Sequence, residues 1–196
     1  MTPPIRIGFA LTGSFCTFSA VLPIVETLVS RGCEITPILS AHAATLDTRF
    51  GAADMWRNRL CEITGREVID SIPAAEPIGP KKLFDILIVA PCTGNTLAKL
   101  AHGVTDTTVT MAVKSHLRGE KPVVLAVSTN DALSGSAANL GTLLNLKHYF
   151  FVPMRQDAPF AKPRSLVADM GRIPETIGAA LENRQLQPIF LAPGEH

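Results

Sequence analysis

The segment 84–106 constrains the fold more than any other part of this chain. It begins with an apolar run of strand length at 85–90, and Pro91 is expected to end the strand because proline cannot donate a hydrogen bond to a sheet ladder. Small polar residues fill 92–96, and the apolar residues beyond them recur at helical spacing up to Gly103, a residue typical of a helix C-cap. The segment therefore predicts a strand, a polar loop and a helix in direct succession.

The same succession is repeated along the chain. An apolar run at 5–11 leads through Thr12-Gly13-Ser14 into a helical stripe over 15–30, where Pro23 predicts a kink or a late helix start. Further strands and helices are predicted, in chain order, at 33–39, 52–63, 107–117, 123–127, 140–146, 148–152 and 166–181. Strands that alternate with helices predict a three-layer αβα Rossmann-like fold with a mainly parallel sheet. We expect a single domain over 1–196.

Three stretches fall outside this regular pattern. Residues 71–83 contain three prolines and a glycine and predict a long loop, which in a compact domain usually contacts a ligand or a partner. A second loop is expected at 154–164, and Pro174 is expected to interrupt the helix that follows it. Residues 182–196 show few packing cues and predict a C-terminal arm.

Composition narrows the class of protein. Apolar residues make up 46% of the chain and charged residues only 18%, so we expect some surface to be hidden by self-association. The net charge of +1 offers no electrostatic basis for binding nucleic acid or an anionic membrane, and no apolar run reaches transmembrane length. The four cysteines form no CxxC pair, which argues against structural zinc and a disulfide framework and predicts a reduced, cytoplasmic protein.

Polar residues follow four of the predicted strands, at Thr12-Gly13-Ser14, Ser40, 92–96 and 128–131. In parallel sheets ligands bind at the carboxyl ends of the strands, so the convergence of four such ends predicts a binding site. The first N–H groups of a helix have no internal partner, which favours an anion there. The dinucleotide fingerprint G-x-G-x-x-G is absent, and an ordinary strand-to-helix turn remains an alternative for the first loop.

Single residues offer several alternatives for chemistry. His42 is a candidate acid or base, or a solvated loop histidine, and His102 suits a helix C-terminus. Cys92 is either a nucleophile at a helix N-terminus or a small buried thiol. Asp106 and Asp131 lie close to the polar loops, but neither has an evident base partner in the sequence. No Ser-His-Asp or paired-carboxylate pattern stands out.

Two motifs carry a resemblance to a known family. Residues 90–96, APCTGNT, with Lys99, Gly103 and Asp106 after them, resemble the P-A-[ST]-x-N-T motif and its sequel in the homo-oligomeric flavin-containing cysteine decarboxylase superfamily. The loop Thr12-Gly13-Ser14 resembles the first flavin-phosphate loop of that superfamily. The resemblance covers most of residues 5–152 and implies a flavoprotein that binds FMN.

The chain departs from this superfamily at two places. Its decarboxylases have a catalytic histidine before the strand that leads into the P-A-S-x-N-T motif, whereas no histidine lies between Ser71 and Phe84. The P-x-M-N motif is replaced by 127–130, VSTN, although Asn130 keeps its place. The resemblance therefore implies the flavin pocket more strongly than cysteine decarboxylation.

A narrower resemblance runs nearly from end to end. Several stretches closely resemble the family of dipicolinate synthase B subunits, namely 12–18, 47–51, 75–81, 121–134, 149–159 and 186–188. This implies an oxidoreductase that converts dihydrodipicolinate to dipicolinate (pyridine-2,6-dicarboxylate) during spore formation, with FMN as its cofactor and NADP bound by a partner, the A subunit of dipicolinate synthase. It also implies a homo-oligomer of trimer-based type in the cytoplasm of the mother cell of a sporulating bacterium. Two alternatives are a flavin-dependent decarboxylase and a non-catalytic protein that stabilises the A subunit.

The resemblance also implies roles for the polar loops. Gly13 and Ser14 would contact the flavin phosphate, and Ser40 would close that pocket. Contacts to the ribityl chain, the ring edge or the substrate would come from Thr93, Asn95, Thr96, Thr129 and Asn130. The complete set implied for flavin binding is Thr12, Gly13, Ser14, Ser40, Thr93, Gly94, Asn95, Thr96, Thr129 and Asn130.

A dicarboxylate substrate needs cationic partners. Arg49, Arg155 and Lys162 are the candidates, each with an ordinary surface charge as its alternative. His42 is the candidate proton acceptor for the oxidation. No metal site is expected.

Overall fold

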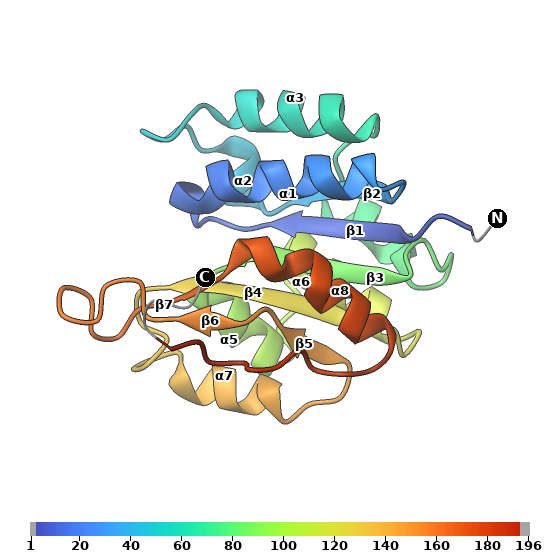
Figure 1. Ribbon diagram of the computed structural model, residues 1–196. Coiled ribbons are helices and arrows are strands. Elements are labelled where there is room, and N and C mark those ends of the chain that lie inside the picture. Colours follow the sequence, from blue (N-terminus) through green and yellow to red (C-terminus); the bar gives the residue numbers. More distant parts are fainter. Residues whose placement is uncertain (1–2, 193–196) are drawn as a thin grey trace.

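Among residues 3–192, which the computed structural model describes, seven strands form one sheet in the middle of the molecule (Figure 1). The strands are, in chain order, β1 (Arg6–Leu11), β2 (Glu34–Leu39), β3 (Ile86–Cys92), β4 (Val123–Thr129), β5 (Tyr149–Phe151), β6 (Met154–Arg155) and β7 (Leu166–Ala168). Their order in the sheet is β2-β1-β3-β4-β7-β6, and β5 also pairs with β4. The strands β1 to β5 pair in parallel, whereas β7 is antiparallel to β4 and β6. The prediction of a mainly parallel sheet is therefore confirmed.

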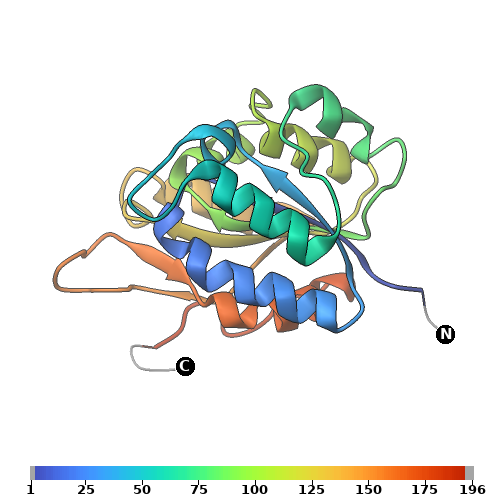
Figure 2. The same ribbon diagram turned by 90° about the horizontal axis from the view of Figure 1, so that it is seen from above.

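Helices cover both faces of this sheet. The α-helices are α1 (Phe18–Ser30), α2 (Ala41–Thr45), α3 (Ala53–Thr64), α4 (Ile72–Ala75), α5 (Gly94–Ala101), α6 (Thr108–Leu117), α7 (Ala137–Leu144) and α8 (Ile173–Leu181), with short 3₁₀ segments η1 (Phe15–Thr17), η2 (Glu76–Ile78) and η3 (Met170–Arg172). Figures 1 and 2 show α1 and α8 on one face and α6 on the other. The expected three-layer αβα arrangement is confirmed. Among residues 3–192, no helix is both long enough and apolar enough to cross a membrane.

The core lies along the two central strands. Every residue of β3 is buried, and β4 is buried as far as Ser128. Strands covered by helices on both faces have no solvent-facing side, which explains why their sequences are almost continuously apolar. Around them Phe9, Phe18 and Phe151 are among the largest side chains that are fully buried.

The expected end of β3 at Pro91 is wrong, because the strand continues to Cys92. Proline removes one ladder donor, but this interrupts the pairing without ending the strand. The pairing with β1 reaches Val89, and the register with β4 shifts between Val89 and Cys92. Within this shift, the carbonyl oxygen of Pro91 accepts a hydrogen bond from Thr12 Oγ1 at 2.7 Å.

The predicted helix 166–181 is wrong over its first part. Residues 166–168 form β7, because pairing with both β4 and β6 outweighs the helical spacing of so short an apolar run. The stretch 154–164, expected as a loop, accordingly opens with β6. Pro174 does not interrupt α8 but lies in its first turn, where a missing N–H costs little.

The stretch 71–83 is not the open loop that its prolines predicted. It contains α4 and η2, and this segment packs on α6. Ser115 of α6 holds it, since its Oγ donates to the carbonyl oxygen of Glu76 at 2.6 Å and accepts from the backbone N–H of Gly79 at 2.8 Å. Pro73 and Pro77 lie in the first turns of their helical segments, where proline is tolerated.

The first part of the expected C-terminal arm lies against the sheet. The side-chain amide of Gln185 exchanges two hydrogen bonds of 2.7 Å with the backbone of Phe151. Farther along, the N–H of Met154 donates to Ile189 O at 2.8 Å, and the N–H of Leu191 donates to Met154 O at 2.9 Å. Residues 193–196 of the expected arm lie outside the described residues.

His116 is a titratable group inside the helical layer. Its side chain on α6 is 2% exposed, and its Nε2 lies 3.2 Å from the carbonyl oxygen of Pro122. Burial lowers the pKa of His116 to about 4. Because the unfolded chain binds this proton at a pKa of about 6.5, unfolding takes up a proton between these two values, and stability falls as the pH falls through that window.

We therefore expect His116→Gln to reduce the acid sensitivity of the fold. Between about pH 7 and about pH 5 the wild-type protein should lose on the order of 1–2 kcal/mol more unfolding free energy than the variant. Urea unfolding at the two pH values measures this difference. His102→Gln, at the exposed end of α5, is the matched control and should behave like the wild type. Equal pH dependence of His116→Gln and the wild type would contradict the assignment.

Candidate functional site

One buried hydroxyl joins the ends of β1 and β3. Thr12, which is 1% exposed, follows β1 directly. Its Oγ1 donates to Pro91 O at 2.7 Å and accepts from the backbone N–H of Thr93 at 3.1 Å. Because Thr93 precedes α5, this pair of hydrogen bonds sets the first loop against the start of that helix.

A second contact brings in the end of β4. Ser14 Oγ lies 3.0 Å from Ser128 Oγ. The first loop, after β1, is therefore bonded to a residue near the end of β4, although β3 lies between these two strands in the sheet. Thr93 is the N-cap of α5, and its Oγ1 accepts from the N–H of Thr96 at 3.4 Å. Three of the four predicted polar strand ends therefore meet through named hydrogen bonds.

A pocket of about 660 Å³ opens where these three ends meet. Its volume lies in the range of small-molecule and cofactor sites. Its lining residues are Gly13, Ser14, Phe15, Cys16, Thr17, Arg49, Phe50, Thr93, Ser128, Thr129, Asn130, Asp157, Lys162, Ser165, Leu166 and Val167. We call it the strand-end pocket.

Six of the residues expected at a site line this pocket together with Lys162: Gly13, Ser14, Arg49, Thr93, Thr129 and Asn130. Thr12 lies beneath it and holds the loops. Ser40 caps α2 instead, its Oγ accepting from the N–H of Ala43 at 3.3 Å. Gly94, Asn95 and Thr96 form the first turn of α5 without lining the pocket.

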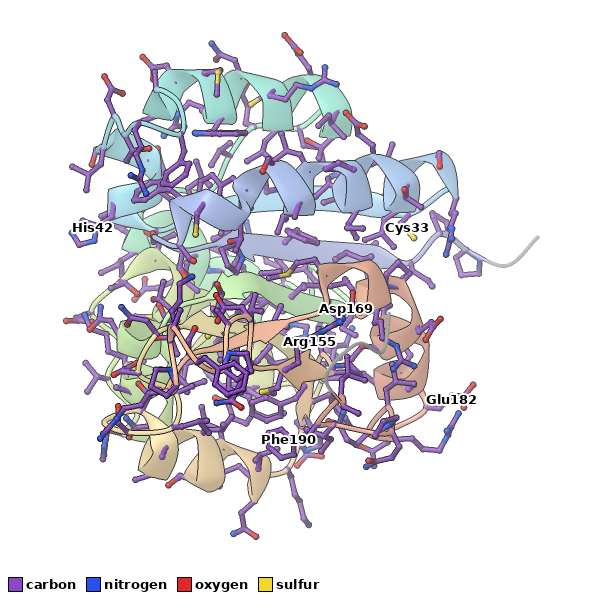
Figure 3. All side chains as sticks on the ribbon, turned by 60° about the vertical axis from the view of Figure 1, so that its left-hand side comes forward. Cys33, His42, Arg155, Asp169, Glu182 and Phe190 are labelled. Atoms are coloured by element: carbon purple, nitrogen blue, oxygen red, sulfur yellow. The ribbon has the colours of Figure 1, made fainter. Side chains whose placement is uncertain are left out.

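Two further candidates, His42 and Arg155, do not line the strand-end pocket. Figure 3 shows His42 at the edge of the molecule, and its side chain on α2 is exposed. Arg155 forms an ion pair of 2.7 Å with Asp169 and lines a separate cavity of about 230 Å³ that includes Phe190. Arg155 and Arg49 are therefore not brought to one pocket.

Sequence reasoning missed several lining residues. Phe15 begins the predicted helical stripe, Phe50 has no polar group that would indicate a site, and Leu166 and Val167 fall within the wrongly predicted helix. The signal for Phe50 was its place in the short stretch 47–51, which ends in glycine.

Arg49 and Phe50 form the tip of a tight turn. Thr48 and Gly51 exchange two backbone hydrogen bonds of 3.0 Å, and the Arg49 guanidinium carbon lies 4.8 Å from the centre of the Phe50 ring. Gly51 has φ 142°, which favours glycine, and a Cβ there would lie 2.9 Å from Trp56 Nε1. The backbone pairing of Thr48 with Gly51 thus fixes the turn from which Arg49 and Phe50 line the pocket.

The start of α5 already faces a carboxylate. Asp131 Oδ1 accepts from Thr129 Oγ1 at 2.6 Å, and Ser136 Oγ lies 3.0 Å from the same oxygen. A Cβ added to Gly94 would lie 2.8 Å from Asp131 Oδ1 and 2.7 Å from Ser136 Oγ. Negative charge is favourable at a helix N-terminus, so Asp131 satisfies part of the anion preference predicted for this helix.

Cys92 is the buried thiol rather than the nucleophile among its two alternatives. It is fully buried, and burial raises the pKa of its thiol to about 12. A nucleophilic cysteine needs a lowered pKa to form the thiolate near neutral pH. Cys92 is therefore a packing residue beneath the loop.

Comparison with known proteins places these features in a family. The Flavoprotein family model matches residues 1–185. The B subunit of dipicolinate synthase from Bacillus subtilis (strain 168) is 48% identical over 186 residues, covering 95% of this chain and 93% of the relative. The crystal structure of the corresponding B subunit from Bacillus halodurans C superposes with a TM-score of 0.88 at 45% identity, covering 96% of each chain. Burkholderia xenovorans DmrB in complex with FMN, described as a cubic protein cage for redox transfer, shares the fold with a TM-score of 0.68 at 19% identity over 93% of this chain and 98% of that one.

The close approach at Gly94 leads to a paired prediction on stability. Gly94→Ala should destabilise the fold by about 1–3 kcal/mol, because its methyl group would displace the Asp131 cluster. Gly141→Ala on α7 meets nothing within 4 Å and should be neutral or stabilising by up to about 1 kcal/mol. Urea unfolding of both variants measures the contrast. Equal effects of the two substitutions would show that Gly94 is not held by this contact.

Proposed function

The chain belongs to the flavoprotein family and is similar over nearly its whole length to dipicolinate synthase B subunits, and from this premise we propose that it is the flavin-binding component of a dipicolinate synthase. The proposed reaction removes two hydrogens from dihydrodipicolinate and yields the aromatic pyridine-2,6-dicarboxylate. The observation that carries the proposal is the strand-end pocket, where three loops join through Thr12 and the contact between Ser14 and Ser128.

The chemistry of this pocket fits FMN. The hydroxyl groups of Ser14, Thr93 and Thr129 suit a polyhydroxylated chain, and Arg49 suits a phosphate or carboxylate. Phe15 and Phe50 supply apolar and aromatic surface for a planar ring. When bound, the flavin supplies a hydride acceptor, which dihydrodipicolinate oxidation requires. NADP, held by the A subunit, is the proposed onward acceptor.

We place the phosphate at Gly13 and Ser14. Another helix N-terminus at the strand ends is that of α5. The Asp131 carboxylate faces it and would repel a phosphate. Contacts to the rest of the flavin are then proposed for Thr93, Thr129 and Asn130, which follow β3 and β4 and line the pocket.

Substrate binding is proposed to depend on Arg49. It is the arginine in the lining of the strand-end pocket, and a carboxylate can accept two hydrogen bonds from a guanidinium group. Lys162 also lines the pocket but is held by Asp157 at 2.8 Å. His42 is proposed as the proton acceptor, since its Cβ lies 3.9 Å from where a Cβ on Gly13 would be. In this role His42 would act from a position beside the loop that contains Gly13.

A second candidate role is that of a non-catalytic protein that stabilises the A subunit. Exposed apolar side chains favour it: Phe160 is fully exposed at the turn between β6 and β7, and Leu133 and Phe190 line the cavity beside Arg155. Self-association into a trimer-based homo-oligomer is also proposed, supported by the cage described for DmrB. The setting proposed for the enzyme is the mother cell of a sporulating bacterium.

The first test is the cofactor itself. We expect the purified chain to carry the visible absorbance of oxidised flavin, or to quench the fluorescence of added FMN in a saturable titration. Ser14→Ala should weaken FMN binding about tenfold through the lost hydroxyl contact, whereas Ser19→Ala, on the exposed face of α1, should not. A colourless protein that ignores added FMN would refute the flavin role.

The second test separates the candidate roles by reconstitution. Dihydrodipicolinate oxidation is measured with the isolated A subunit, with this chain added, and with its His42→Gln variant. If His42 accepts the proton, the variant should lose about 10²-fold or more of the added activity while binding FMN normally. His102→Gln is the matched control and should keep full activity.

Full activity of the isolated A subunit would instead favour the non-catalytic role. Release of CO2 from a cysteinyl peptide or a thiol substrate would favour the decarboxylase alternative. An unchanged rate with His42→Gln would remove His42 from the mechanism.

A further inference from the structure

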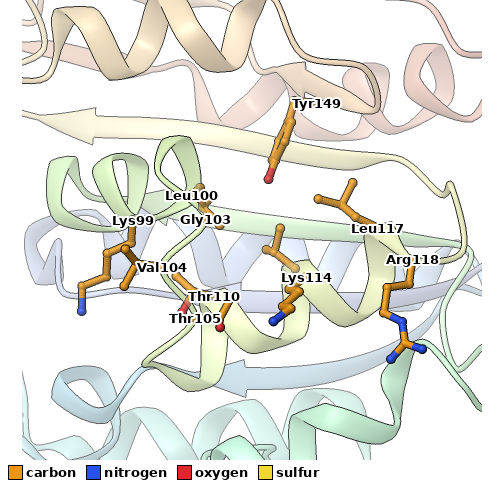
Figure 4. Close-up of a pocket in the computed structure, with 11 residues that line it drawn as sticks. Lys99, Leu100, Gly103, Val104, Thr105, Thr110, Lys114, Leu117, Arg118 and Tyr149 are labelled. Atoms are coloured by element: carbon orange, nitrogen blue, oxygen red, sulfur yellow. The ribbon is translucent and has the colours of Figure 1, made fainter.

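A second pocket lies between α5, α6 and the start of β5 (Figure 4). Its volume is about 400 Å³, which suffices for a small organic molecule. The lining residues are Lys99, Leu100, Gly103, Val104, Thr105, Thr110, Val113, Lys114, Leu117, Arg118 and Tyr149. None of them lines the strand-end pocket, so the two sites are separate. We call this second site the α5–α6 pocket.

Apolar side chains form most of its wall. Leu100 and Val113 are almost fully buried, whereas Val104 is 41% exposed. Leu117 from α6 and the ring of Tyr149 from β5 complete the wall. A flat apolar body can therefore contact both helices at once.

All charged side chains in this lining are cationic. Lys99 is held by both carboxylate oxygens of Asp106, at 2.7 and 2.9 Å. Lys114 and Arg118 form no ion pair with any residue in 3–192. Lys114 lies in the last turn of α6 and Arg118 is its C-cap residue, four positions later, a spacing at which like charges repel each other. An anion at this mouth would relieve that repulsion.

The hydroxyl of Thr110 in this lining is bonded to Thr107, whereas two other hydroxyl groups of the lining have no partner among residues 3–192. The side chains of Tyr149 and Thr105 make no hydrogen bond to any residue that the structure describes. In Figure 4 the Tyr149 hydroxyl points from β5 toward α5 and α6. Burial raises the pKa of Tyr149 to about 12, so the hydroxyl remains a neutral donor near neutral pH.

We propose that the α5–α6 pocket binds a small planar ring that carries a carboxylate. The ring would lie against Leu100, Val113 and Leu117, with the carboxylate at Lys114. In Figure 4 the Lys114 ammonium and the Arg118 guanidinium both point to the side away from Tyr149, and Arg118 lies farther out. Lys114 is therefore the principal anion partner in this proposal, and the charge of Arg118 adds to the attraction for an anion. The hydroxyl of Tyr149 is available to a polar atom of the ring.

This chemistry has two sources, an aromatic monocarboxylate and a pyridine dicarboxylate. The pyridine dicarboxylate would be the product of the proposed reaction, and only its binding here rests on the proposed function. Binding of the product here would make the pocket a second product site, apart from the strand-end pocket.

The test uses the full chain in its native assembly and ligand-observed NMR titration. Benzoate should bind with a dissociation constant on the order of 1 mM, as expected of a ligand of this size. Benzamide has the same shape without the charge and should bind at least about fivefold more weakly. Pyridine-2,6-dicarboxylate is the second probe and distinguishes the two sources.

Variants locate the binding. Lys114→Gln should weaken benzoate about fivefold or more, and Tyr149→Phe should weaken it less, while Lys147→Gln at an exposed position outside the pocket should have no effect. Arg49→Gln, in the strand-end pocket, should leave benzoate binding unchanged. FMN binding by Lys114→Gln should equal that of the wild type, so a failure of the flavin proposal and a failure of this one can be told apart.

Four results would overturn the proposal. Three of them are equal binding of benzoate and benzamide, unchanged benzoate binding by a folded Lys114→Gln protein, and loss of benzoate binding in Arg49→Gln. If benzoate does not bind at all and Val104→Glu dissociates the native assembly, this face is an interface between copies of the chain, and the proposal also falls.

Discussion

The position of the strand-end pocket depends on the hydroxyl group of Thr12. A parallel sheet aligns its strand ends, but it leaves the loops beyond them free to diverge. The Thr12 hydroxyl uses both of its capacities at once, donating to Pro91 O and accepting from the N–H of Thr93. It is also almost completely buried, so neither bond competes with water and a lost partner would leave a buried polar group unsatisfied. A cofactor pocket assembled from separate loops needs such a link, because no single loop can hold its whole geometry.

The register shift near the end of β3 occurs at the residue to which Thr12 is bonded. The register between β3 and β4 shifts between Val89 and Cys92. Pro91 lies within this shift, and its carbonyl oxygen is the one that accepts the hydrogen bond from Thr12. Pro91, which removes a donor from the sheet, is thus also the residue whose carbonyl oxygen holds the first loop through Thr12.

Much of the fold could be predicted because its cause is local. The spacing of apolar residues and the polar clusters after the strands indicated the parallel sheet and the edge at which loops converge. The failures have nonlocal causes: β7 depends on pairing with β4 and β6, and α4 with η2 depends on Ser115, far along the chain. Arg155 is the corresponding case among the site residues, since a sequence displays its charge but not its ion pair with Asp169.

α5 connects the two pockets of this protein. Its first turn follows Thr93 at the strand-end pocket, and its last turn brings Lys99 and Leu100 to the α5–α6 pocket. Eight residues of helix measure about 12 Å, too short a length to bend appreciably. A Cβ on Gly94 would meet Asp131 and Ser136, so the first turn of α5 has no room for a methyl group. A substitution that displaces this helix would therefore alter the walls of both cavities, although they share no lining residue.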